Sequence, residues 1–162
     1  MDAIKLMRVA IVGYGNQGRA QALNLRDSGI DVAIAIRENS KSIGLVEADG
    51  FKHIDISAAA RECDLISLLI PDQVMADVYE NKISRYLKPG KMLMFSHGYN
   101  IHYQEIQPPP FVDVAMVAPS GPGHAVRNEF KEGRGVPTLL AVMQDVTGKA
   151  RDIALSYSKA IG

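Results

Sequence analysis

The sequence of 162 residues predicts an α/β domain of the Rossmann type, with a doubly wound, mainly parallel sheet and helices on both faces. Two observations lead to this prediction. An apolar strand at residues 9–12 runs directly into Gly-x-Gly-x-x-Gly at residues 13–18, and a helical pattern follows it. Further along the chain, short apolar strands alternate with helical segments, which implies right-handed crossovers and parallel strand pairing.

Each expected element has a local reason. Residues 17–27 carry helical apolar spacing that Gly29 ends, and residues 30–36 are rich in Ile, Val and Ala, as in a strand buried on both faces. Ser57 is the expected N-cap of the helix that follows it. The other expected strands are residues 51–54, 64–70, 92–95, 112–117 and 137–142. The other expected helices are residues 43–49, 58–63, 72–79 with an extension to 87, 101–106, 124–131 and 147–161.

Composition limits the classes of function. The chain is 47% hydrophobic and 22% charged, so we expect one globular domain over residues 1–162. Eighteen basic and eighteen acidic residues give no bulk attraction to nucleic acid or anionic lipid. No apolar run is long enough to span a membrane, and no signal peptide begins the chain. Cys63 is the single cysteine, more typical of apolar packing than of a nucleophile, and a cytoplasmic location is expected.

The glycine motif predicts a dinucleotide site. Gly13 permits a tight turn, Gly15 has no Cβ to hold a pyrophosphate away from the backbone, and Gly18 lets the helix pack closely on the strand. The free N–H groups and positive dipole end of that helix then face the anion. The alternative is a structural glycine turn, which the flanking strand and helix make less favourable.

The loop after the second strand bears on the choice between NAD and NADP. Arg37 and Lys41 supply cations there, and Ser40 and Ser42 supply hydroxyl donors, a combination that suits a ribose 2′-phosphate. Glu38 argues for NAD, because a carboxylate repels the phosphate or holds the ribose. The pattern favours NADP, and a solvated polar loop is the alternative.

One histidine is well placed for chemistry. His97 directly follows a buried strand, at the carboxyl end where open α/β sheets bind ligands, and it could polarise a carbonyl or carry a proton. Surface or capping roles are expected for the other three histidines, His53, His102 and His124. Helix capping alone explains Asp72, and residues 120–123 could bring backbone amides to a ligand or simply form a turn. No carboxylate cluster has the spacing of a magnesium site.

Together these segments resemble ketol-acid reductoisomerase, also called acetohydroxy acid isomeroreductase. The most specific runs are His-Gly-Tyr-Asn-Ile-His at residues 97–102 and Gly-Pro-Gly-His at 121–124. The other matching runs are Gly-Tyr-Gly-Asn-Gln-Gly at 13–18, Leu-Asn-Leu-Arg-Asp-Ser-Gly at 23–29, Ser-Lys-Ser at 40–42, Glu-Ala-Asp-Gly-Phe at 47–51, Leu-Ile-Pro-Asp at 69–72, Met-Val-Ala-Pro at 116–119 and Gly-Val-Pro at 135–137. The resemblance covers nearly the whole chain.

The resemblance implies an activity and a set of contacts. Family members shift an alkyl group in 2-acetolactate or 2-aceto-2-hydroxybutyrate and reduce the ketone with NADPH, in valine and isoleucine synthesis. His97 matches the family's active-site histidine. Besides Gly13 and Gly18 of the turn, the cofactor contacts implied are Tyr14, Gly15, Asn16, Gln17, Arg37, Ser40, Ser42, Asp72, Gln73, Val74, Met75 and Gly123.

Two departures from the family pattern matter. The family's magnesium-binding carboxylates lie on a helical C-terminal domain, which would begin beyond Gly162, so we expect this chain to hold NADP(H) but no Mg²⁺ and to be inactive alone. Ser120 stands where the family typically has a lysine, and loss of that cation would weaken turnover. Two alternatives are a free-standing NADP(H)-binding or sensing module that acts through a protein partner, and a dehydrogenase of the β-hydroxyacid type. The oligomeric state is left open.

Overall fold

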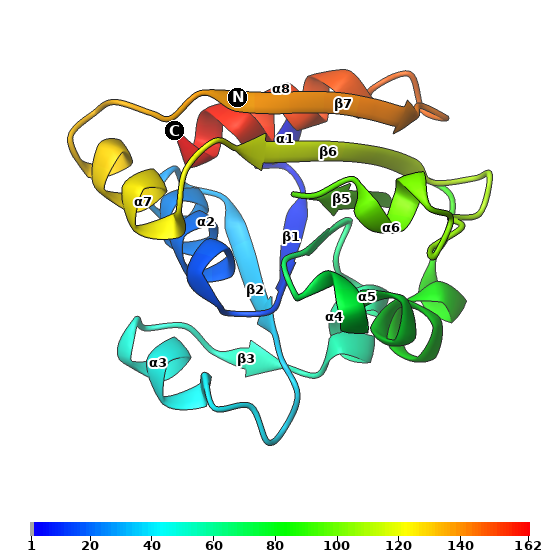
Figure 1. Cartoon of the computed structure of the whole chain (residues 1–162), viewed down its shortest axis with the longest axis horizontal. Helices are drawn as coiled ribbons and strands as arrows, with labels where there is room; N and C mark the ends of the chain where they lie inside the picture. Colours follow the sequence, from blue (N-terminus) through cyan, green and yellow to red (C-terminus); the bar gives the residue numbers. More distant parts are fainter. Residues whose placement is uncertain (1) are drawn as a thin grey trace.

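A computed structural model describes residues 2–162, whose strands form one seven-stranded sheet in the order β3-β2-β1-β4-β5-β6-β7 (Figure 1). The strands are β1 Arg8–Val12, β2 Asp31–Ala35, β3 His53–Ile54, β4 Leu65–Leu68, β5 Met92–Phe95, β6 Asp113–Pro119 and β7 Thr138–Gln144. The helices are α1 Asp2–Lys5, α2 Asn16–Asp27, α3 Ile43–Ala48, α4 Ile56–Glu62, α5 Asp72–Val78, α6 Tyr99–His102, α7 Gly123–Lys131 and α8 Ala150–Ile161. The predicted Rossmann-type α/β fold is confirmed.

The central strand β1 explains the layered arrangement. Its side chains alternate between two cores: Val9 and Ile11 pack on one side of the sheet, and Ala10 and Val12 pack on the other. Helices α1, α2 and α8 contribute to the first core, and α4, α5 and the π-turn after it contribute to the second. A strand that buries both faces needs apolar residues at every position, which is why residues 9–12 read as a continuous apolar run.

The strand order reverses beside β1. From β1 the chain builds outward through β2 and β3, and then returns to place β4 on the other side of β1. Val9 pairs in parallel with Val32 of β2 and with Leu65 of β4. In open α/β sheets a ligand crevice forms at the carboxyl ends of the strands at such a reversal. The glycine turn follows β1 and therefore lies at this edge.

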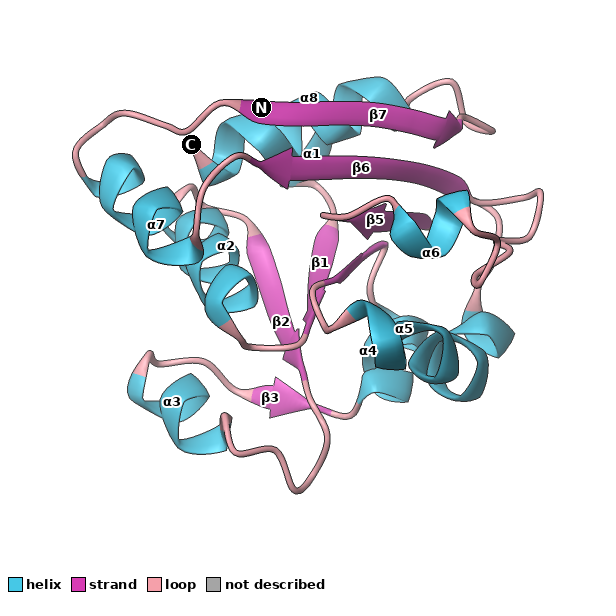
Figure 2. Ribbon diagram, in the orientation of Figure 1, coloured by secondary structure: helices cyan, strands magenta, loops and turns pink. Residues whose placement is uncertain are grey.

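The last strand departs from the parallel pattern. β7 pairs antiparallel with β6, which the predicted mainly parallel sheet allows but which the alternation of strands and helices does not locate. Figure 2 shows the reason: α7 packs beside α2, and the chain from residues 132 to 137 then runs back to the outer side of β6. As an edge strand β7 is poorly covered, with Leu139 65% and Met143 60% exposed.

Several helix boundaries differ from the predictions. The cap of α4 is Asp55, whose carboxylate accepts the backbone N–H of Ser57 at 2.8 Å, so the prediction of Ser57 as the cap is wrong. The helix expected to extend to residue 87 is α-helical only to Val78, and a π-turn and a 3₁₀ turn follow. The short helix expected at residues 101–106 is α6, which begins and ends earlier.

The start of the last helix is also later than expected. Residues 145–149 form a turn, and α8 begins at Ala150, whose N–H is accepted by Asp145 Oδ1 at 3.0 Å. Buried Asp113 holds this turn, because its carboxylate accepts the N–H groups of Val146 and Thr147. Within residues 2–162, none of the helices combines the length and the apolar character that crossing a membrane would need.

Candidate functional site

The three glycines of the motif differ in what surrounds them. Gly13 has φ +99°, and a Cβ there would lie 2.6 Å from Ile70 Cγ2. A Cβ on Gly18 would lie 2.3 Å from the Gly13 carbonyl oxygen. At Gly15, in contrast, no atom outside residues 14–16 of the described chain lies within 4 Å of a Cβ built on the backbone. The turn and packing roles predicted for Gly13 and Gly18 are confirmed, and the space beside Gly15 is open to a ligand.

Gly15 is also the N-cap residue of α2. The first N–H groups of an α-helix have no partner within the helix, and they carry the positive end of its dipole. Gly15 brings no side chain to satisfy them. This helix terminus can therefore accept an anionic group from the carboxyl edge of the sheet.

Asn16 and Gln17, within the glycine motif, contact the residues just before and at the start of α7. The Gln17 amide donates from Nε2 to the Gly121 carbonyl oxygen at 2.8 Å. A Cβ on Gly123 would lie 2.0 Å from the Asn16 carbonyl oxygen, so only glycine fits where α7 meets α2. The structure brings the predicted residues Asn16, Gln17 and Gly123 together. Gln17 has a structural partner, and the glycine at 123 is required by packing.

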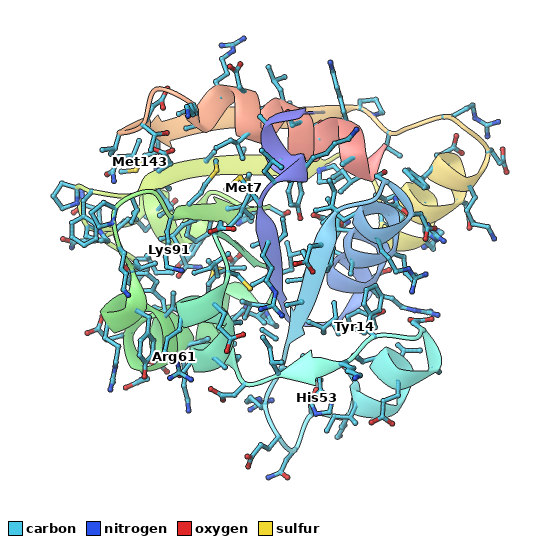
Figure 3. The ribbon with its side chains drawn as sticks, turned by 180° about the vertical axis from the view of Figure 1, so that it is seen from behind. Met7, Tyr14, His53, Arg61, Lys91 and Met143 are labelled. Carbon is cyan, nitrogen blue, oxygen red and sulfur yellow. The ribbon has the colours of Figure 1, made fainter. Side chains whose placement is uncertain are left out.

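Tyr14 points away from the open side of the turn. Its ring is 3% exposed and packs edge-on against Phe51, with 6.1 Å between ring centroids. Its hydroxyl donates to Asp49 Oδ2 at 2.9 Å. Figure 3 labels Tyr14 on the side of the molecule where α2 and α3 lie. Burial, and then the hydrogen bond to Asp49, raise the pKa of the Tyr14 phenol. Tyr14 can therefore contribute to a cofactor site only through its backbone.

Asp49 joins α2 to the end of α3. The Arg19 guanidinium donates from Nε to Asp49 Oδ2 at 2.7 Å and from NH2 to Oδ1 at 2.9 Å, and Arg26 donates to the Asp49 carbonyl oxygen at 2.6 Å. Hydrogen bonding to Arg19, opposed by burial and assisted by Tyr14, lowers the pKa of the Asp49 carboxyl. The C-terminal end of α3, the helix that follows the loop of residues 36–42, is thereby held against α2.

That loop presents its polar groups to solvent. Arg37, Glu38 and Lys41 are exposed, and Ser40 and Ser42 are half-buried. The Ser40 hydroxyl oxygen accepts the Ser42 N–H at 3.2 Å, which leaves the Ser40 O–H available as a donor. Across residues 2–162, neither Arg37 nor Lys41 has an ion-pair partner. Both cations can therefore face an added anion.

Asp72 and His97 meet at the carboxyl ends of β4 and β5. His97 Nδ1 lies 3.0 Å from Asp72 Oδ2, and the His97 side chain is 68% exposed. The buried Asn100 amide donates to Asp72 Oδ1 at 3.1 Å. The N-cap of α5 is Pro71, so the interpretation of Asp72 as a helix cap is wrong. Sequence spacing gave no signal of this contact, because 25 positions separate Asp72 from His97.

The three residues after Asp72 differ in their exposure to solvent. Gln73 and Val74 are exposed, and Met75 is 3% exposed and packs in the second core. The side chains of Gln73 and Val74 are accessible to a ligand, and the side chain of Met75 is not.

Next to His97, an apolar hollow of about 410 Å³ is lined by Phe95, Ile101 and Met116, and by Met143 of the edge strand.

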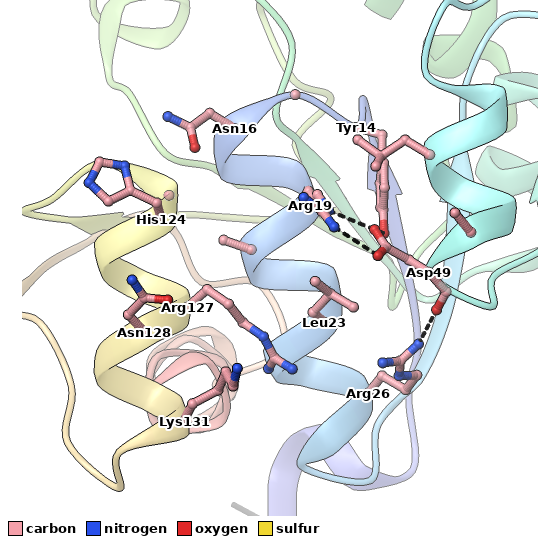
Figure 4. Close-up of a pocket in the computed structure, with 15 residues that line it drawn as sticks. Tyr14, Asn16, Arg19, Leu23, Arg26, Asp49, His124, Arg127, Asn128 and Lys131 are labelled. Carbon is pink, nitrogen blue, oxygen red and sulfur yellow. Dashed lines mark hydrogen bonds and ion pairs between the residues drawn. The ribbon is translucent and has the colours of Figure 1, made fainter.

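A second hollow, of about 810 Å³, begins at the glycine turn, where Gly15 and Asn16 line it, and extends along the flank of α2 (Figure 4). Its walls come from α2, α3 and α7 and include Arg19, Arg26 and Arg127. These cations already have carboxylate partners, since Asp49 binds Arg19 and Asp27 binds both Arg26 and Arg127. These arginines therefore connect helices, and the end of the hollow beside Gly15 is a better candidate for a cofactor than its walls along α2.

A buried polar chain beneath the turn was not predicted. The Tyr157 hydroxyl of α8 donates to Gln21 Oε1 at 2.7 Å and lies 3.2 Å from the Ser67 hydroxyl. The Gln21 amide in turn donates to Gln17 Oε1 at 3.1 Å. Burial raises the pKa of the Tyr157 phenol. The only sequence signal was the four-residue spacing of Gln17 and Gln21 on one helix face.

Metal ligands are not gathered in the described chain. Residues 2–162 hold no group of three or more His, Cys, Asp or Glu side chains that could bind a metal ion. The side chains of residues 2–162 therefore do not fit a magnesium site. Cys63 is buried, as expected for a packing residue, and burial raises the pKa of its thiol to about 11.

Comparison with known proteins identifies the family. Residues 3–162 match the family model of the acetohydroxy acid isomeroreductase NADPH-binding domain. The chain belongs to this family. It is 44% identical to an NADH-preferring ketol-acid reductoisomerase from an uncultured archean, with a TM-score of 0.96 over 99% of this chain. The match covers 50% of that protein, so the chain spans half the length of this reductoisomerase.

More distant structures share the fold. A semialdehyde dehydrogenase NAD-binding protein from Cupriavidus necator, solved with calcium and NAD, is 21% identical, with a TM-score of 0.80 over 96% of this chain and 59% of its own. Plasmodium falciparum pyrroline carboxylate reductase, solved with NADP, is 17% identical, with a TM-score of 0.74 over 98% of this chain and 56% of its own. The chain is thus a reductoisomerase NADPH-binding domain with the Rossmann architecture.

Proposed function

We propose that this domain binds NADP(H) across the carboxyl ends of β1, β2 and β4. The pyrophosphate would lie at the N-terminus of α2, the 2′-phosphate at the loop of residues 37–42, and the nicotinamide toward His97. The observation that carries the proposal is the open space beside Gly15, between two glycines that are enclosed by other atoms. A Cβ would fill that space, which is why the motif needs glycine there.

The reaction proposed is that of the family. NADPH, when bound, supplies a hydride to the ketone that forms after an alkyl shift in 2-acetolactate or 2-aceto-2-hydroxybutyrate. The residues of this chain would bind the cofactor and orient it, and His97 would face the substrate. Carboxylates for Mg²⁺ would come from the helical domain that the family carries, since residues 2–162 gather no such cluster. A cytoplasmic location completes the proposal and accords with a single, buried cysteine.

We propose a preference for NADPH over NADH. In this proposal Arg37 and Lys41, exposed cations without an ion-pair partner in residues 2–162, and the hydroxyls of Ser40 and Ser42 would contact the 2′-phosphate, and Glu38 opposes them with one carboxylate. An arginine contact to phosphate is a charge-assisted hydrogen bond worth about 1.5–3 kcal/mol, which exceeds the effect of one exposed repelling charge. The similar protein from the uncultured archean prefers NADH, so the loop of this chain has to be tested directly.

The experiment compares both cofactors in the wild-type chain and in two loop variants. Titration by nicotinamide fluorescence should show tighter binding of NADPH than of NADH. Arg37→Ala should weaken NADPH binding by about tenfold or more and leave NADH binding nearly unchanged. Glu38→Gln, the matched control in the same loop, should not weaken NADPH binding. Equal affinities for the two cofactors in the wild-type chain would overturn the assignment of the 2′-phosphate.

A further inference from the structure

An active-site histidine can exchange a proton only when the correct ring nitrogen is free. In a neutral imidazole one nitrogen carries the proton and the other accepts, and the partner of the first nitrogen decides which is which. We propose that Asp72 is a positioning residue that fixes His97 as the Nδ1–H tautomer and leaves Nε2 free to face the substrate. The catalytic purpose of this pair rests on the proposed function, but the contact between Asp72 and His97 does not depend on it.

The two side chains lie within ion-pair distance. His97 Nδ1 lies 3.0 Å from Asp72 Oδ2, and the side chain of Asp72 is 28% exposed. A carboxylate accepts and does not donate, so the proton of this bond must sit on Nδ1. The Tyr99 N–H donates to Nδ1 at 3.4 Å, and this longer hydrogen bond would be given up when Nδ1 carries the proton, because a protonated nitrogen cannot accept. The shorter contact to a charged group prevails.

Asp72 is itself held in place. The Asn100 amide donates both to Asp72 Oδ1 at 3.1 Å and to the Asp72 carbonyl oxygen at 3.3 Å, and Asn100 is 1% exposed. One carboxylate oxygen is thereby fixed by a buried amide, and the other remains for His97. A carboxylate that served only the helix would need neither contact, and Pro71 already occupies the N-cap of α5.

The consequence for chemistry concerns Nε2. When Nε2 accepts a proton, the ring becomes an imidazolium and its positive charge lies beside the Asp72 carboxylate. When Nε2 returns that proton, the same tautomer is restored. The other titratable groups around this contact are Tyr99 and His102 of α6, and His102 shares the lining of the apolar hollow with His97. Among these groups only Asp72 carries a negative charge at neutral pH.

Nitrogen-15 NMR of the imidazole rings tests the proposal on this chain without any turnover. Spectra are recorded about two pH units above the ordinary histidine pKa of about 6.5, where the ring is neutral. His97 should show an excess of the Nδ1–H tautomer, about tenfold relative to exposed His124. Asp72→Ala should abolish the excess and Asp72→Asn should reduce it. Asp77→Asn, an exposed carboxylate of the same helix, should leave it unchanged.

The outcomes separate this inference from the proposed function. A wild-type His97 ring with the tautomer distribution of His124 would overturn the role of Asp72. So would an Nδ1–H excess that survives in Asp72→Ala. Fluorescence titration of NADPH on the same samples reports cofactor binding independently, and circular dichroism establishes that each variant is folded. Loss of NADPH binding with the tautomer intact would count against the proposed function and leave the Asp72–His97 pair in place.

Discussion

The Tyr14 hydroxyl donates a 2.9 Å hydrogen bond to Asp49, and so joins the glycine turn to the end of α3. The residue between the first two glycines of the motif therefore holds α3, the helix that follows the loop of residues 37–42. Arg19 binds the same carboxylate from α2. The hydrogen bonds to Asp49 therefore connect the glycine turn and α2 to α3, the helix that follows residues 37–42.

Tyr14→Phe should destabilise the fold by about 1.5 kcal/mol, because the variant removes a hydrogen bond to a charged, mostly buried carboxylate and keeps the ring packing. Urea unfolding followed by circular dichroism measures this change. Tyr103→Phe, at a ring that is 62% exposed, is the matched control and should change the free energy of unfolding little. Equal effects of the two substitutions would show that the bond to Asp49 contributes nothing.

Stability should also fall in acid through Asp49. Its pKa is lowered in the folded chain, first by the hydrogen bond from Arg19, so the folded state binds fewer protons than the unfolded state in this range. The stabilisation is present above the ordinary aspartate pKa of about 3.9 and is lost as pH falls through the lower folded value. Asp49→Asn should be less stable at neutral pH and should lose less stability below about pH 4. Parallel stability–pH curves for the two proteins would contradict this.

Gly123→Ala should damage the contact between α2 and α7. The added Cβ would lie 2.0 Å from the Asn16 carbonyl oxygen, and relief requires a backbone shift, which in a packed region costs about 1–3 kcal/mol. Gly121→Ala is the control, since its Cβ would meet Val136 at 3.6 Å, an ordinary contact distance. Thermal unfolding should therefore show a marked loss for the first variant and little change for the second. A Gly123→Ala protein as stable as wild type would refute the packing role.

Much of the fold could be predicted from local chemistry. The strand at residues 92–95 was predicted with its observed bounds, because continuous apolar runs between Pro-Gly and a polar loop have few other interpretations. The antiparallel pairing of β7 could not be predicted, since it depends on where α7 packs. Likewise, Ser57 and Asp55 are both good capping residues, and only the backbone path decides between them.

The site was predicted in part. Gly13, Gly15 and Gly18 could be given separate roles, because each role follows from the absence of a Cβ at a fixed place in a turn. The partners of His97, Tyr14 and Gln17 could not be predicted, because Asp72, Asp49 and Gly121 lie far away in sequence and meet them only through tertiary packing. Sequence position indicated which residues lie near the site, but not where their side chains point.

The most direct test of the central claim is NADPH binding by Gly15→Ala, with Gly18→Ala as the contrasting variant. At Gly15 an alanine meets no atom outside residues 14–16 within 4 Å, so the fold should lose only the roughly 0.5–1 kcal/mol by which Ala is a poorer N-cap than Gly, and NADPH affinity should fall because the Cβ would occupy the space proposed for the pyrophosphate. Gly18→Ala should instead destabilise the fold, since its Cβ would lie 2.3 Å from the Gly13 carbonyl oxygen. Calorimetric titration of NADPH, with thermal unfolding of the same samples, should show a folded Gly15→Ala chain that binds at least tenfold more weakly than wild type. Unchanged affinity in a folded Gly15→Ala chain, or no NADPH binding by the wild-type chain, would contradict the account.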